Sequence, residues 1–581
     1  MSDQDLARRL RGGEDFAGLT LHEVDLRGEG LGPARLGKAK LVRAQLDGAG
    51  LAGADLGEAQ LVLSSLPGAD LTGANLVGAV GYSVDLAGAR LARARLNGAR
   101  LAKVSLAKAD LTGADLEGAA LLETNLAGAC LAGANLTGAV LEGADLTGAD
   151  LRGARLERTV LAKAKLMGAR LDGASLTQVV AQKACLRGVD LSSASLDTCM
   201  LMEADLRGAV LPRSLQKSKL DDAILSKLDL ARRDGTAVSP EAGDPEHADL
   251  TGRDLHFTSL RGVCLRGARL AGANLEMADL SSCDLRGADL KGAILKRAIL
   301  GKADLSGVDL SGQDLEMTLL LEADLRLADL TGARLVMTLL DGADLSGARL
   351  SQAFLWGASV KGASLEQVIL DGSTWKTVDF SGTDLTRMVF TGLSLTRCAF
   401  RKSKLAGMDL SGCDLSLADF HEADLTGAKL TGATAAQATF EKARLDTADL
   451  TELQAKGAYF GEASLSGTKL GKAKLRFSSF GGAELRFANF ASADLRETIW
   501  TRASARGALF HSARLDYADF SHADLREADF SSASLSFTLL HDVRDAGAVY
   551  AGARTLTTRK TDVELLEAEA YRPPPRPRAS T

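Results

Sequence analysis

The sequence predicts an all-β solenoid, a chain wound into stacked coils, and three observations support this fold class. Leu or Phe returns at every fifth residue over 16–211, where only Gly81 and Ala181 break the rule. The same rule holds in a second frame over 250–550, and large aromatic residues there also recur at twenty-residue spacing. A period of five fits neither a helix nor a plain strand, so the chain must turn within each repeat.

The first element expected is a short helix over residues 1–15. Ser2 is a good N-cap residue, Leu6 and Leu10 are four residues apart, and a Gly-Gly pair follows as a stop signal. The end coil of a solenoid lacks a neighbour on one side. We therefore expect this helix to cover the first coil.

Two repeat arrays follow, at residues 16–230 and 248–555. Segments such as 109–113 (ADLTG) and 288–292 (ADLKG) place Ala two residues before the central Leu, Asp one before it and Gly two after it. Ala and Leu fit together in a narrow interior, whereas Asp, Thr and Lys face water. Gly supplies the backbone freedom that a corner requires.

This A(D/N)LxG motif, in nearly tandem copies over most of residues 16–550, closely resembles the pentapeptide repeat family. The resemblance implies a right-handed quadrilateral parallel β-helix with about 20 residues per coil.

The aromatic residues give independent evidence for four sides. One set recurs every twenty residues and predicts a stacked interior ladder: Phe380, Phe400, Phe420, Phe440, Phe460, Phe480, Trp500 and Phe520. A second set keeps the same spacing but is displaced by ten residues, which is the opposite side of a square: Phe490, Phe510, Phe530 and Tyr550.

Between the arrays the repeat slips by one residue, and Leu215, Leu220, Leu225 and Leu230 are expected to belong to further coils. Residues 231–247 lack a periodic apolar residue and contain Gly and Pro, so they predict a loop or a hinge. The spacing of Leu230 and Leu250, one coil length, favours a nearly continuous rod over two hinged rods.

The last elements are a capping helix at 556–571 and a disordered tail rich in Pro and Arg at 572–581. Thr561 and Glu564 form a capping-box pattern directly before Leu565 and Leu566.

Composition excludes several classes of function. The 69 basic and 75 acidic residues leave a net charge of −6, so we expect no nucleic-acid partner. The charged start does not resemble a signal peptide, and no apolar run approaches the ~20 residues that span a bilayer, which predicts no membrane association. Seven cysteines without CxxC spacing indicate reduced thiols and a cytoplasmic location.

The sequence also predicts a non-enzyme without a cofactor. The seven histidines are scattered, none lies in a HExxH pair, and no phosphate-binding glycine motif joins a strand to a helix. The many carboxylates occupy outward positions that the repeat fills with polar residues in any case. We therefore expect no catalytic, cofactor-binding or metal site.

The candidate partner-binding residues are apolar side chains at outward or corner positions, where the repeat normally carries polar residues or Gly. They are Val140, Val160, Val180, Met200, Ile299, Met317, Leu319, Met337, Leu339, Phe354 and Trp356. One interpretation is that they stack within the sheet, which their strand preference allows. The other is a docking stripe for a protein partner or a second copy of the chain.

The predicted function is thus a protein–protein interaction scaffold or adaptor, which binds an unidentified protein partner or a second copy of itself in a homo-oligomer. The opening segment is similar to some family members associated with type VI secretion, which would make the chain an accessory of that system. The alternative that the family suggests is a DNA-mimic modulator of type II topoisomerase (gyrase) that protects against inhibitors. That role implies an acidic rod with inserted loops, from which this chain departs.

Overall fold

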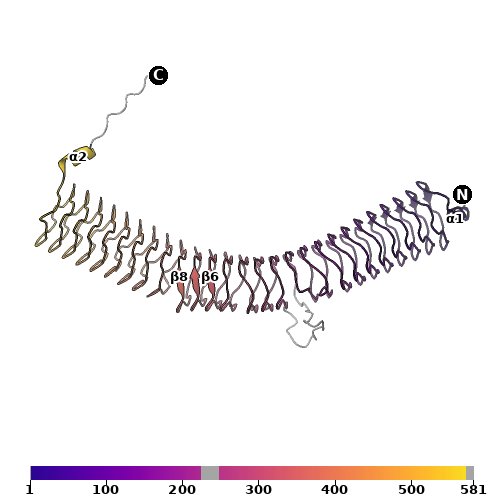
Figure 1. The fold of residues 1–581 in the computed structure, drawn as a ribbon, viewed down its shortest axis with the longest axis horizontal. Coiled ribbons are helices and arrows are strands. Elements are labelled where there is room, and N and C mark those ends of the chain that lie inside the picture. The colour runs from indigo at the N-terminus through magenta and orange to yellow at the C-terminus, as the bar shows by residue number, and fades with distance from the viewer. Residues whose placement is uncertain (1, 224–247, 571–581) are drawn as a thin grey trace, which may run out of the picture. The chain divides into compact units, whose positions relative to one another are not determined.

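The computed structural model describes residues 2–223 and 248–570 (Figure 1). The chain divides into two compact units, Met1–Asp309 (unit 1) and Leu310–Thr581 (unit 2). The predicted loop at 231–247, the predicted coil residues Leu225 and Leu230, and the predicted tail at 572–581 lie outside the described residues.

Each coil pairs with the next through four parallel bridges at twenty-residue spacing. In unit 1 one such set is Asp110↔Cys130, Asp115↔Asn135, Ala120↔Val140 and Asn125↔Asp145. At each bridge the two neighbouring coils are joined by backbone hydrogen bonds, as where Leu111 N donates to Cys130 O at 2.7 Å. Four bridges per coil confirm the predicted four-sided parallel solenoid.

The interior is built from the central Leu and the Ala two residues before it. Leu111 is 0% exposed and Ala109 is 1% exposed. The Ala114 N–H donates to the Leu111 carbonyl at 3.0 Å and closes the corner between them. Gly113 lies in this corner at φ +62°, a left-handed conformation that Gly adopts without strain.

Within the described residues, eight coil sides are regular enough to form strands. Unit 1 has a parallel sheet of β1 (Thr20–His22), β2 (Lys40–Val42), β3 (Gln60–Val62), β4 (Val80–Tyr82) and β5 (Arg100–Ala102). Unit 2 has a parallel sheet of β6 (Arg334–Val336), β7 (Phe354–Trp356) and β8 (Thr374–Lys376). Within both sheets the register is twenty residues per strand, as in Leu335↔Leu355.

The aromatic ladders of unit 2 form as predicted. Rings from Phe380 to Phe520 stack in one column with centroids 4.3–5.2 Å apart. Rings from Phe490 to Tyr550 stack in a second column at 4.8–5.2 Å. The columns meet edge to face, as in Phe510 and Phe520 at 5.9 Å, an arrangement that aromatic quadrupoles favour.

The one-residue slip of the repeat is absorbed where Met200 pairs with Lys219, nineteen residues on. The next pairs, Ser214↔Asp254 and Lys219↔Ser259, span forty residues. Coils on the two sides of 224–247 are therefore hydrogen-bonded directly to each other inside unit 1.

A helix lies near each end of the described chain. α1 (Asp3–Arg11) begins at the Ser2 N-cap, and Leu6, Ala7 and Leu10 are buried at 0–2% exposure. α2 (Val563–Ala570) has no buried residue. Its cap differs from the prediction, because Asp562 Oδ1 accepts from Leu565 N at 3.1 Å, while Thr561 Oγ1 instead accepts from Asp542 N at 3.3 Å.

Candidate docking surface

The position before each central residue forms one column along each side of the solenoid. Where this position carries Asp, the carboxylate turns back to the backbone, as on another side, where Asp384 Oδ1 accepts from Thr386 N at 3.2 Å. This bond, together with that of the Thr386 hydroxyl, lowers the pKa of Asp384. A Val, Leu or Ile in this position cannot make such a bond and leaves an apolar column.

The valine set of unit 1 is one continuous column. The pairs Val140↔Val160, Val160↔Val180 and Val180↔Met200 are consecutive parallel bridges. The three valines are half-buried, and Met200 is 40% exposed. These side chains cover one another and offer little contiguous apolar area to a partner.

Ile299 lies on the same side of unit 1 but apart from the valines. The column runs from Met200 through Lys219, Ser259 and Asp279 to Ile299, each paired with the next. Three polar residues thus separate Ile299 from Met200.

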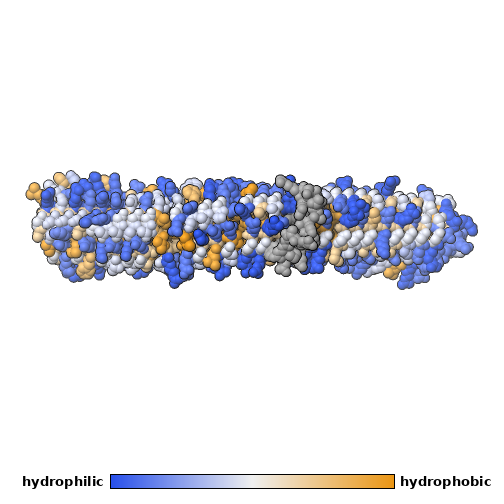
Figure 2. Space-filling view, turned by 90° about the horizontal axis from the view of Figure 1, so that it is seen from below, coloured by the Kyte–Doolittle hydropathy of each residue, from blue (hydrophilic) through white to orange (hydrophobic). Residues whose placement is uncertain are grey.

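The remaining six candidates come together in unit 2, and we name them the docking strip: Met317, Leu319, Met337, Leu339, Phe354 and Trp356. Leu319 pairs with Leu339, and Val336 pairs with Trp356. Met317 N donates to Val336 O and Met337 N to Trp356 O, both at 2.8 Å, which joins the corner to the strands. Figure 2 shows hydrophobic surface at the level of β6 to β8.

Exposure within the docking strip is greatest at the corner and on β7. Met317 is 45% exposed and Met337 is 50% exposed, while Phe354 is 40% and Trp356 48% exposed. Leu319 and Leu339 are half-buried beside them.

A local reason for the shape of the corner lies at Gly357. A Cβ added there would lie 2.6 Å from the Met337 sulfur, so the Met337 side chain lies against Gly357 and would have to shift for a larger residue. Both corner methionines have positive φ, +57° at Met317 and +53° at Met337, where Gly or Asn is favoured over long side chains. An apolar side chain at such a position is a departure from the repeat that backbone geometry does not explain.

Charged groups flank the docking strip. Arg334 contacts Asp314 at 3.1 Å and Glu316 at 2.7 Å, and Lys361 contacts Asp379 at 3.0 Å. Burial raises the pKa of Asp379, but hydrogen bonds from Ser381 and Lys361 outweigh it and leave the pKa below its ordinary value. The strip therefore has an apolar centre and an ionised rim, the anatomy of a protein interface.

A second apolar group in unit 2 was missed by the sequence analysis, and we name it the distal patch: Tyr459, Phe477, Ile499, Tyr517 and Phe537, each 43–60% exposed. Tyr517 and Phe537 stack at 5.0 Å, and Arg476 lies 4.5 Å from the Phe477 ring centre. A hollow of about 460 Å³ lies beside Ile499 and Tyr517. The available signal was the set of aromatic residues, Phe477, Tyr517 and Phe537, in a corner position that mostly holds Gly or a polar residue.

The docking strip and the distal patch share one side of unit 2, through Leu319 and Leu339 in the strip and Tyr459 and Ile499 in the patch. A single column of paired residues runs from Leu319 and Leu339 through Ser359, Asp379, Ala399, Asp419 and Thr439 to Tyr459, Ser479 and Ile499. Eight pairings separate Leu339 from Ile499. At the ~4.8 Å spacing of adjacent strands they are about 38 Å apart.

The buried thiols offer no nucleophile to a catalytic site. Burial raises the pKa of Cys199, Cys283 and Cys398 to about 12. The Cys199 thiol donates to the Leu176 carbonyl at 2.8 Å, and Cys283 donates to Leu260 at 2.9 Å. These cysteines replace Ala or Thr of the repeat and fill the interior.

A membrane span was not expected, and none of the helices in residues 2–223 and 248–570 is both long and apolar enough to cross a bilayer.

The comparisons with known proteins agree with the repeat geometry. The model of pentapeptide repeats matches residues 44–80, 82–118, 119–158, 154–192, 246–276, 264–301, 273–312, 314–347, 338–374, 463–502, 488–526 and 506–542, and that of a pentapeptide repeat region matches 373–450. A search of curated protein sequences found no match to the chain.

Among solved structures, HetL from the cyanobacterium Nostoc is 30% identical, covers 52% of this chain and 97% of its own, and has a TM-score of 0.15. QnrB1, a plasmid-mediated fluoroquinolone resistance protein, is 18% identical and covers 34% of this chain and 98% of its own, with a TM-score of 0.23. Rfr23 from the cyanobacterium Cyanothece is 21% identical over 32% of this chain and 88% of its own, with a TM-score of 0.12. These TM-scores carry no functional weight, but the family models match well over half of the chain, which belongs to the pentapeptide repeat family.

Proposed function

We propose that this protein is a non-enzymatic scaffold that binds another protein through the docking strip of unit 2. The observation that carries the proposal is the gathering of six apolar side chains on two adjacent sides and the corner between them. Exposed Trp, Phe and Met at the centre of a charged rim are typical of binding hot spots.

The stacking alternative accounts for the valine column better than for the docking strip. Val140, Val160 and Val180 are half-buried by their own column. Trp356 is 48% exposed, although it pairs with Val336 and Lys376 on either side. Packing within the sheet therefore leaves much of its indole in contact with water.

The sharpest test replaces Leu319 and Leu339 with Asp. The same column already carries Asp379, Asp419 and Asp519, so the solenoid accepts Asp at this position. The double variant is expected to fold and to lose the apolar contact.

A second variant changes the corner, with Met337→Asn and Trp356→Thr. Asn tolerates the positive φ of Met337, and Thr suits a strand, so neither change strains the backbone. The matched control is Phe487→Asn, which removes an apolar side chain that is 66% exposed at another corner with φ +57°.

Partner binding is measured by capture from a native lysate with quantitative mass spectrometry. Self-association is measured by light scattering. We expect a partner that the wild type and the Phe487→Asn variant retain equally and that both strip variants lose by about tenfold or more. Retention of every partner and of the oligomeric state by the strip variants would refute the proposal. A second copy as the lost partner would show that the strip joins like chains.

The identity of the lost partner also separates the finer roles. A spike or cargo component would support an accessory role in type VI secretion, and a gyrase subunit would support topoisomerase modulation. The surface speaks against DNA mimicry, because many outward carboxylates are paired with guanidinium groups. The carboxylate and guanidinium groups are 2.6 Å apart within each of three such pairs, Asp150–Arg152, Asp284–Arg286 and Asp524–Arg526.

A further inference from the structure

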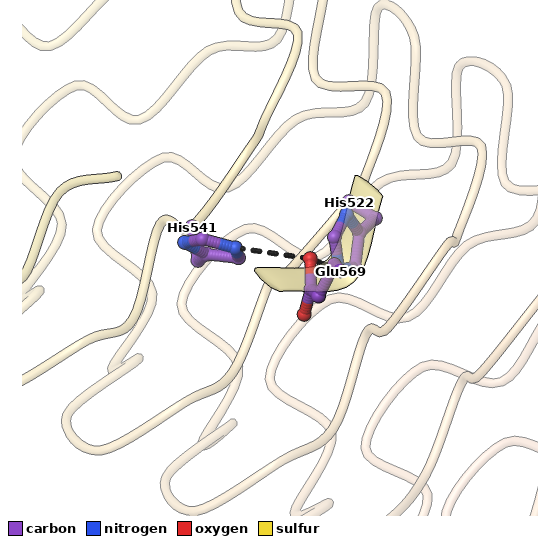
Figure 3. A group of neighbouring side chains, drawn as sticks. All are labelled: His522, His541 and Glu569. Atoms are coloured by element: carbon purple, nitrogen blue, oxygen red, sulfur yellow. Dashed lines mark hydrogen bonds and ion pairs between the residues drawn. The ribbon is translucent and has the colours of Figure 1, made fainter. Parts of the chain in front are cut away.

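Two histidines and a glutamate converge where α2 meets the solenoid (Figure 3). His522 lies in a corner after Phe520, His541 follows Leu540 in the next coil, and Glu569 lies on α2. One ligand atom from each residue lies within 4.8 Å of the other two. The Glu569 carboxylate is 3.3 Å from His541 Nε2 and 3.4 Å from His522 Nε2.

Sequence spacing could not reveal this group. A metal site on a single helix places its histidines three or four residues apart, whereas His522 and His541 are nineteen apart. Coil stacking brings them together: His522 N donates to the His541 carbonyl at 2.8 Å. Their rings meet edge to face with centroids 5.3 Å apart.

The two contacts of Glu569 have the length expected in a tetrahedral zinc site. Zn–N and Zn–O bonds of ~2.0–2.1 Å place neighbouring ligands of a tetrahedron about 3.4 Å apart. The two contacts of Glu569, at 3.3 and 3.4 Å, have this length. Two imidazoles and one carboxylate are also a set of ligands that zinc prefers.

The groups behind the histidines orient them. His522 Nδ1 lies 3.1 Å from Asp542 Oδ2, so the Nδ1–H donates to this carboxylate and the Nε2 lone pair points at the cluster. A carboxylate behind a histidine in this way is a common support for metal ligands.

His541 is held differently and predicts a change on metal binding. Its Nδ1 accepts from Asp562 N at 3.2 Å, so the neutral ring carries its proton on Nε2 and donates it to Glu569. A metal ion at Nε2 takes the place of that proton. The displaced proton is exchanged through water to Nδ1, so the ring stays neutral. The Asp562 N–H then loses its acceptor and must donate to water instead.

We propose that His522, His541 and Glu569 form a Zn²⁺ site, with water as the fourth ligand, that fastens α2 to the last coils. α2 has no buried residue, so packing does little to hold it. A metal bridge between Glu569 and two coils would supply that attachment. The site does not depend on the docking function proposed above.

The experiment uses the full chain without a histidine tag, stripped by a chelator and titrated with Zn²⁺ alone by calorimetry. Co²⁺ serves as a coloured substitute that reports four-coordinate geometry. We expect one Zn²⁺ per chain. Glu569→Gln, which keeps the side-chain shape, should weaken binding about tenfold or more.

Two further variants keep the result interpretable. Glu567→Gln on the same exposed helix is the matched control and should bind like the wild type. His522→Asn removes a second ligand and leaves the buried His541, which is 1% exposed, unsubstituted. Binding that is absent, or equal in the Glu569 and Glu567 variants, would overturn the site.

Amide hydrogen exchange tests the fastening of α2 separately. We expect Zn²⁺ to slow exchange in 563–570 in the wild type and in Glu567→Gln, but not in Glu569→Gln. Glu569→Gln could instead speed exchange, relative to the wild type, by the same factor in Zn²⁺ and in chelator. That result would mean that a His–Glu ion pair alone holds the helix, and it would refute the metal proposal.

Discussion

The helices at the two ends of the described chain are held by different interactions. At the amino end α1 buries Leu6, Ala7 and Leu10 over the first coil, and Arg11 reaches Glu29 at 2.9 Å. At the carboxyl end α2 buries nothing, and Leu556 in the last coil is fully exposed. Apolar packing seals one end, and polar contacts of Glu569, Asp562 and Thr561 hold the helix at the other.

The difference shows that a helix at the end of a solenoid is not by itself a cap. An end coil needs its apolar interior covered, because each coil depends on its neighbours for burial. α1 meets this need with side chains on one face. α2 does not, so its position depends on polar contacts with the last coils, and the comparison can be tested at both ends.

The largest contrast between the two ends is expected from matched changes in the two helices. Leu6→Ala and Leu10→Ala each remove a buried side chain and should lower the free energy of unfolding of unit 1 by about 2–5 kcal/mol. Denaturant unfolding followed by circular dichroism, with hydrogen exchange to locate the loss, measures this effect.

The matched change on α2 is Leu565→Ala, since Leu565 is 46% exposed. Its effect should stay within about 0.5 kcal/mol, as for other surface substitutions. Equal effects at Leu10 and Leu565 would show that α2 seals its end after all.

A smaller contrast should appear within the aromatic column that reaches the open end. Phe510 is 0% exposed between Phe490 and Phe530, and Phe510→Ala should destabilise unit 2 by about 3–5 kcal/mol. Tyr550 stacks on Phe530 at 5.2 Å but is only half-buried, so Tyr550→Ala should have a smaller effect. Calorimetric or denaturant unfolding of the two variants gives the ratio, and equal losses would argue that the last coil is covered.

The repeat made most of this fold predictable. Its period gave the coils, and the phase of Phe380 and Phe490 gave two aromatic columns that the structure confirms. The helix at Leu6 and Leu10 was also foreseen from its cap and spacing. The five-residue rule works because every coil places the same position in the same environment.

The site was less predictable, because the repeat does not say which outward side chains become neighbours around a corner. Leu319 and Leu339 stood out as a column, but Tyr517 and Phe537 occupy the corner position and were missed. The meeting of His541 with Glu569 depends on how α2 returns to the coils, which no local pattern encodes. Whether the leucines of α2 become buried likewise depends on tertiary packing, and in the structure they stay exposed or half-buried.

Acid should weaken both ends by a small and similar amount. Hydrogen bonds from the Arg27 side chain and backbone lower the pKa of Asp25, near the amino end, to about 2. Hydrogen bonds from Ser531 lower the pKa of Asp529 near the carboxyl end. Both values lie below the ~3.9 of an unfolded Asp, so the ionised form stabilises the fold above that pH.

This stabilisation is lost as the pH falls through the folded-state pKa values. The unfolding midpoint should therefore change little from pH 7 to about 5 and decline from about 4 towards 2. Hydrogen exchange at each pH shows where coils open first. Acid neutralises carboxylates of the same kind at both ends, so only the apolar cover differs between them. If acid opened the amino end before the carboxyl end, the buried face of α1 would not be the stronger seal.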